Sequence, residues 1–189
     1  MRRIPMVLAL AAILLASCSA DGGQPVGAGS EPASSAEASV DPIPPVQDPK
    51  RLAGTPPCSL LSPVQLTDNH MDLPARSKDV LGAPGCVWDN TAHTREIRIY
   101  VDIGNDVLHN VYAQRKTFPV FEVTQLAAHP AIRTKDNVAA TSCTVRVATA
   151  ERQTFVVVFT SLRQGLEEPC GPARALAEAV LANLPPLKG

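Results

Sequence analysis

The chain has 189 residues, of which 45% are apolar, 19% charged and 4% aromatic, and its formal net charge is −1. This length suits one ordinary domain and is too short for two comfortable ones. The near-neutral charge excludes the clustered basic surface that nucleic-acid binding requires, so no nucleic-acid partner is expected. Eighteen prolines beside four phenylalanines and one tryptophan indicate that part of the chain does not build a packed core.

Residues 1–17 have the features of a secretion signal. Met1-Arg2-Arg3 is cationic, and Val7–Leu15 is an apolar run too short to span a bilayer core of about 30 Å. The run ends in Leu15-Ala16-Ser17-Cys18, which resembles the bacterial lipobox. The resemblance implies that the Cys18 sulfur carries a diacylglyceryl group. Its two acyl chains bind a membrane far more stably than one chain would. We therefore expect a lipid anchor on the outer face of the cell membrane; the alternative is an ordinary cleaved signal with a coincidental cysteine.

Residues 18–50 are expected to be the lipidated cysteine and a disordered tether. From Ser19 to Lys50 the chain holds six prolines, and it has five acidic residues against one lysine. No period of 2 or 3.6 residues appears there, which is typical of a flexible spacer. Residues 51–189 then form a single extracytoplasmic domain of common size.

Helix signals occur at three places in the domain. The sequence of residues 62–65, Ser-Pro-Val-Gln, combines a capping serine, a proline suited to the first turn and a glutamine that completes a capping box. It predicts a helix to about Asn69. A second helix is predicted between Asn105-Asp106 and Pro119. A third is predicted over 172–184, where apolar residues fall on one stripe.

Strand signals lie between these helices. Residues 97–103 alternate between branched apolar side chains and polar or aromatic ones, which is typical of a half-buried strand. Residues 155–159 are apolar on both faces and predict a central strand. The remaining predicted strands are 86–89, 121–126 and 144–149, the last forming a hairpin with 154–160. The predicted fold is α+β: an antiparallel sheet of about five strands covered by helices on one or both faces, in the order α-β-β-α-β-β-β-α.

Four cysteines remain after Cys18, and an exported domain permits disulfides. They are Cys58, Cys86, Cys143 and Cys170. Three connectivities are open, and Cys58–Cys86 with Cys143–Cys170 is preferred because it closes the shortest loops at the least entropy cost. Each such bond contributes about 3.5 kcal/mol in the chain-entropy model. A metal site or a redox pair is the alternative, but no C-x-x-C occurs and no histidine lies at ligand spacing from a cysteine.

No catalytic, cofactor or metal motif appears in the sequence. The four histidines are interpreted as solvated surface groups, and two aspartate pairs as acids at turns and helix ends, without the spacing of a calcium loop. These residues are His70, His93, His109, His129, Asp68, Asp72, Asp102 and Asp106. Glu167-Glu168 suits the dipole of the last helix, Gly82–Gly85 is read as a tight turn, and Trp88 as core packing beside a disulfide. The chain is therefore not expected to be an enzyme and no cofactor is expected.

Two motifs behind the lipobox carry a family resemblance. Residues 57–62, Pro-Cys-Ser-Leu-Leu-Ser, and residues 85–88, Gly-Cys-Val-Trp, resemble those of a group of small actinobacterial lipoproteins of unknown function. The resemblance implies an envelope location and a Cys58–Cys86 bridge, and it supplies no catalytic residues. The order of elements also resembles PsbP-like α/β/α domains, which act as binding or accessory modules; that likeness is one of topology only.

Three functions remain open on this sequence. The leading hypothesis is a membrane-tethered, non-catalytic module that binds an envelope protein or a small ligand. The second is a carrier of a lipid or other apolar molecule, which requires an apolar cavity. The third is an envelope hydrolase whose residues meet only in the fold, which requires a nucleophile with a base within reach.

Overall fold

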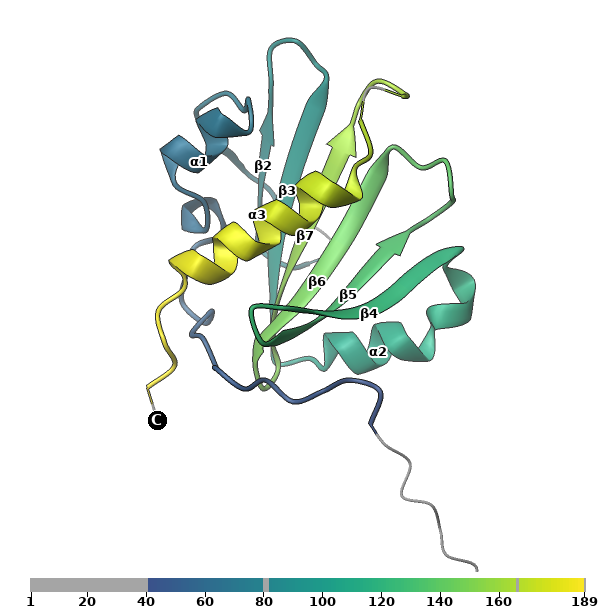
Figure 1. The fold of residues 1–189 in the computed structure, drawn as a ribbon. Coiled ribbons are helices and arrows are strands. Elements are labelled where there is room, and N and C mark those ends of the chain that lie inside the picture. The colour runs from purple at the N-terminus through teal and green to yellow at the C-terminus, as the bar shows by residue number, and fades with distance from the viewer. Residues whose placement is uncertain (1–40, 80–81, 166, 189) are drawn as a thin grey trace, which may run out of the picture. The chain divides into compact units, whose positions relative to one another are not determined.

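The computed structural model describes residues 41–79, 82–165 and 167–188 (Figure 1). The expected signal, Cys18 and most of the expected tether lie outside these residues. The helices of the described part are η1 (Pro57–Ser59), α1 (Pro63–Asp68), α2 (Val107–Ala113), η2 (Arg115–Thr117) and α3 (Cys170–Asn183). The strands are β1 (Arg76–Ser77), β2 (Gly85–Asp89), β3 (Arg95–Ile103), β4 (Val120–Leu126), β5 (His129–Lys135), β6 (Ser142–Ala150) and β7 (Gln153–Ser161).

The described strands form one antiparallel sheet in the order β1-β2-β3-β7-β6-β5-β4. The α+β class and the antiparallel sheet are confirmed, but the sheet has seven strands rather than about five. The missed β1 is too short to show a period. The missed β5 begins with His129-Pro130, which reads as a break in a strand. In the structure the ladder between β5 and β6 runs from Ala131 to Thr134, so Pro130 lies outside it.

The three predicted helices are all present. Ser62 Oγ accepts from the backbone N–H of Gln65, and the Gln65 side chain accepts in return from the Ser62 N–H, so the predicted capping box of α1 is formed. The α3 helix begins at Cys170, two residues before the predicted start. Glu168 makes this earlier start favourable, because one of its carboxylate oxygens accepts from the N–H groups of Cys170 and Gly171.

The larger core lies between α3 and one face of the sheet. The buried residues of α3 include Ala173 and Ala177, which are fully buried. They pack with the inward-facing residues of β3, β6 and β7, among them Ile99 and Phe155. Trp88 on β2 belongs to the same core, as the sequence predicts. Figure 1 shows α3 running across this face of the sheet. We call this side the α3 face.

Both disulfides lie on the α3 face. Cys58–Cys86 joins η1 to β2, and Cys143–Cys170 joins β6 to the first residue of α3. These are the two pairs with the shortest loops, with sequence separations of 28 and 27. Cys86, Cys143 and Cys170 are buried in the larger core. The covalent bonds therefore fasten the elements that cover one side of the sheet.

A smaller core lies on the opposite side of the sheet. Leu108 of α2 packs there with Ile132 of β5 and Ile43, and Phe121 and Val123 of β4 contact the same cluster. Figure 1 shows α2 beneath β4 and β5. Helices therefore lie on both faces of the sheet, although α2 covers only the end formed by β4, β5 and β6.

Candidate functional site

A hollow of about 620 Å³ lies beside the smaller core. Its walls are the segment of residues 41–49, the beginning of α2 and the turn between β6 and β7. Its apolar lining includes Ile43, Val46, Val107, Leu108, Pro130 and Leu187. The volume and the apolar lining with a few polar groups are typical of ligand-binding sites in proteins. We call this hollow the groove.

The segment of residues 41–49, called the strap below, forms one wall of the groove. Ile43 is buried against Leu108 and Ile132. At the end of the strap, the Leu187 N–H donates to Pro49 O over 2.8 Å, and the Lys50 N–H donates to Thr149 O over 2.8 Å. The sequence of these residues predicts a part of the tether, because it shows no hydrophobic period. One buried isoleucine and a few backbone hydrogen bonds attach them to the domain. Contacts of this kind leave no periodic pattern in the sequence from which they could be predicted.

His109 links the strap to α2 at the edge of the groove. Its Nδ1 lies 2.8 Å from Asp106 Oδ1, and its Nε2 lies 2.9 Å from Asp41 Oδ1. Asp106 also caps α2, since its Oδ1 accepts from the His109 backbone N–H. The hydrogen bonds to Asp106 and Asp41 raise the pKa of His109. The Ile43 N–H and the imidazole together lower the pKa of Asp41.

His109 is predicted from the sequence to be a solvated surface group, and its connection to the strap is not visible there. Asp106 stands three residues before it and could have been suggested as a cap and partner. Asp41 lies 68 residues away in the chain. Only the fold brings the strap and α2 together, so no spacing rule identifies this contact.

His129 corrects the expectation that all four histidines are surface groups. It is buried at the start of β5, and its Nδ1 lies 3.2 Å from Ala148 O. Burial lowers its pKa, so the neutral imidazole is favoured. His70 and His93 are turn residues with positive φ. Within the described ranges, no three His, Cys, Asp or Glu side chains converge in a way that could hold a metal ion.

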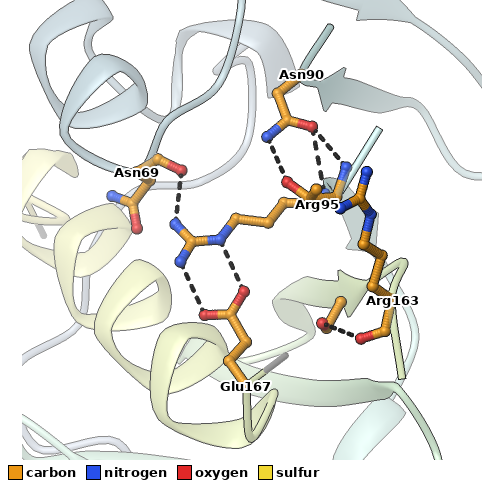
Figure 2. Close-up of polar contacts among 7 residues, drawn as sticks. Asn69, Asn90, Arg95, Arg163 and Glu167 are labelled. Carbon is orange, nitrogen blue, oxygen red and sulfur yellow. Dashed lines mark hydrogen bonds and ion pairs between the residues drawn. The ribbon is translucent and has the colours of Figure 1, made fainter. Parts of the chain in front are cut away.

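A half-buried polar cluster joins three loops at one end of the sheet (Figure 2). Arg95, the first residue of β3, makes two hydrogen bonds to the carboxylate of Glu167, of 2.7 and 3.0 Å. The Arg95 Nη1 also donates to Asn69 O at the end of α1. Asn90 closes the β2–β3 turn by accepting from the Thr94 and Arg95 N–H groups. Arg95 and Glu167 satisfy one another's charge, so this cluster is a structural clamp.

A second hollow, of about 290 Å³, lies beside the beginning of α3. Its lining is rich in charged side chains that already have partners. Arg133 pairs with Glu122, and Arg174 with Glu178. Glu168 caps α3 and lies 3.6 Å from the Lys135 ammonium. The groove, which is larger and mainly apolar, is therefore the better candidate binding site.

The chain matches no curated protein and no solved structure. No helix of the described part is long and apolar enough to cross a membrane. One family model matches over residues 13–183, and its description is "Protein of unknown function (DUF3558)". The match spans most of the chain, including the motif that ends at Cys18 and all four cysteines of the domain. The chain therefore belongs to the DUF3558 family of proteins of unknown function.

Proposed function

We propose that the chain is a lipoprotein of the small actinobacterial type that its motifs resemble, anchored through Cys18 to the outer face of the cell membrane. Its domain acts as a non-catalytic module that binds an envelope protein or a small ligand. The family match supports the anchor in one respect: it begins at residue 13 and so includes the Leu15–Cys18 motif. Two disulfides are in keeping with an oxidising, exported location.

The groove is the observation that carries the binding function. It has the size of a ligand site, and its lining combines apolar side chains with polar ones such as Asp106, His109 and Arg152. It also lies where the strap meets the domain, so a bound partner would contact both.

The geometry around His109 supports a non-catalytic role for the groove. A general base needs a free ring nitrogen within reach of the proton that it removes. Both ring nitrogens of His109 are instead occupied by carboxylates. The contacts of His109 thus favour a structural role over the activation of a nucleophile.

Carriage of an apolar small molecule is the second candidate function, favoured by the apolar lining of the groove. The space between α3 and the sheet is filled by fully buried side chains such as Ala173, Ala177 and Phe155. A carried molecule would therefore occupy the groove rather than the larger core.

The anchor is tested by the Cys18→Ser variant in the native cell envelope. Without the sulfur there is no site for the lipid, so we expect the variant in the medium or as an unprocessed precursor. Fractionation with a blot of the chain, and metabolic labelling with a fatty acid, measure this. Normal maturation and membrane retention of Cys18→Ser would contradict the anchor.

The binding function is tested by photo-crosslinking of the full chain in its own membranes. A benzophenone amino acid at Val46, in the groove, is expected to capture a specific partner. The matched control carries the same group at Val64, which is 69% exposed on α1 and outside the groove. Identical products from the two positions, or none from Val46, would contradict the groove as the binding site. Native mass spectrometry of the same material distinguishes a carrier, which retains an added small mass.

A further inference from the structure

On the side of the sheet opposite α3, helix α2 does not cover β3, β7 or part of β6. We call this surface the open face; its side chains are Glu96, Arg98, Tyr100, Thr144, Arg146, Val158 and Thr160, with the buried Val156 among them. The strand register places Arg146, Val156 and Tyr100 in one row across three strands. Thr144, Val158 and Arg98 form the next row. The open face is therefore a mixed surface of aromatic, hydroxyl, aliphatic and cationic groups.

Arg146 differs from every other half-buried arginine of the described part. The others are Arg95, Arg98 and Arg133, and their guanidinium groups pair with Glu167, Glu96 and Glu122, respectively. Arg146 has no carboxylate within 4.0 Å among the described residues. Its Nη1 donates to the Thr134 hydroxyl over 2.9 Å, and this is its one side-chain hydrogen bond there.

A half-buried cation without an ion-pair partner is unfavourable, because its desolvation is not fully offset. The charge of Asp136, which lies beyond ion-pair distance, compensates the burial of Arg146 only in part. Burial accordingly lowers the pKa of Arg146, although a guanidinium remains charged at neutral pH. A carboxylate brought to Arg146 from outside would pair with the guanidinium donors that Thr134 leaves free and offset this cost. The chemistry of Arg146 thus favours an anionic group supplied by a binding partner.

The neighbours of Arg146 resemble those at the centre of a protein interface. The Phe118 ring centroid lies 6.0 Å from the guanidinium carbon. Burial raises the pKa of Tyr100, which keeps its hydroxyl protonated and able to donate a hydrogen bond. Arginine and tyrosine beside apolar groups are the residues that contribute most to binding at protein interfaces.

We propose that the open face docks a protein partner that presents an acidic side chain, whose carboxylate binds Arg146 beside Tyr100. The proposal rests on the proposed role as a binding module, and it assigns a surface separate from the groove. A protein is the occupant that fits, because Arg146, Tyr100 and Arg98 lie on a sheet surface and line neither of the two hollows described above. A sheet surface of this kind offers a small anion little enclosure but offers a partner a broad area of contact.

The test measures binding of two short peptides to the full chain by fluorescence anisotropy. One is Val-Glu-Val-Glu-Val, and its control carries glutamine in place of glutamate. We expect the acidic peptide to bind about tenfold more tightly than its control, and Arg146→Gln to remove this preference. Arg146→Lys, which keeps the charge without the bidentate geometry, should retain part of it. Arg51→Gln is the matched control on an exposed arginine and should change nothing.

Several outcomes would overturn the proposal. Equal binding of the two peptides, or equal effects of Arg146→Gln and Arg51→Gln, would show that Arg146 recognises no carboxylate. Competition by inorganic phosphate at the peptide's own concentration would point to a small anion. A gain in peptide affinity on replacing Asp21, Glu31 and Glu37 with their amides would show that the tether itself occupies the face. Val46→Glu changes the groove and not the open face. Loss of binding at the groove can therefore be distinguished from loss of carboxylate binding at Arg146.

Discussion

The two faces of the sheet are built from the same strands but have opposite properties. On β3, Ile97 and Ile99 point to the α3 face and are fully buried, while Arg98 and Tyr100 point to the open face and are half-buried. The α3 face is held by a large apolar core and two disulfides. The open face, which lies beside the smaller core, carries an ion pair between Arg98 and Glu96 and a hydrogen bond from Arg146 to Thr134. Because side chains alternate along each strand, most of the stabilising contacts lie on the α3 face, and the open face remains available for recognition.

The largest expected effect comes from removing the disulfide that fastens α3. Cys143→Ala with Cys170→Ala should lower the free energy of unfolding by about 3.5 kcal/mol, because the unfolded chain regains the entropy of a long open loop. Urea unfolding measures this. Arg146→Gln on the open face is the comparison variant, and its effect should stay below about 1 kcal/mol. Equal losses in the two variants would contradict the unequal contributions of the two faces.

The clamp at the end of the sheet should contribute less than the disulfide. Arg95→Ala leaves Glu167, which is 18% exposed, without its partner. We expect a loss of about 2 kcal/mol, between the values for surface and buried ion pairs. Arg76→Ala is the control, since the Arg76–Asp89 pair is well exposed and should contribute under about 1 kcal/mol. Thermal unfolding of both variants measures the difference, and similar shifts in Tm would contradict the role of the clamp.

The β4–β5 turn offers a stabilising substitution. Its two residues, Ala127 and Ala128, have φ of 45° and 67°, in the left-handed region that disfavours a side chain. Ala128→Gly should therefore raise the free energy of unfolding by about 0.5 kcal/mol, after the entropy cost of glycine is subtracted. Chemical denaturation detects this gain. Ala139→Gly, in an exposed loop, is the control, and a similar gain there would contradict the argument from φ.

The same turn explains why part of the sheet could not be predicted. Two-residue hairpins are recognised by glycine or asparagine, and this one has two alanines followed by His129 and Pro130. By contrast, the capping box of α1, the alternation of β3 and the apolar stripe of α3 are local signals, and each predicted its element. The contacts of the candidate sites are not local. The His109–Asp41 contact and the absence of a carboxylate beside Arg146 depend on how distant segments meet.

The smallest expected effect concerns the strap, which is held by a titratable contact rather than a covalent bond. The pKa shifts of His109 and Asp41 define the pH range in which this contact holds the strap. Because the folded pKa of His109 is raised, its contribution is full below the ordinary value of 6.5 and is lost as the pH rises through the folded value. Because the pKa of Asp41 is lowered, its contribution is full above 3.8 and is lost as the pH falls through the folded value. The strap should thus be held best in mildly acidic solution.

The Ile43 amide reports this change, since it donates to Asp41 Oδ1 over 2.9 Å beside the imidazole. We expect its hydrogen exchange, corrected for the intrinsic effect of pH, to be faster at pH 8.5 than at pH 5.5. His109→Asn should remove the difference, while His93→Asn, at an exposed turn, should keep it. Asp106, Glu151 and Arg152 are the other charged groups that line this part of the groove. A pH effect that survives His109→Asn would contradict the role of His109. If His109 is responsible, mild acidity holds the strap against α2 and alkalinity loosens it, whereas the disulfide-bonded α3 face should not respond.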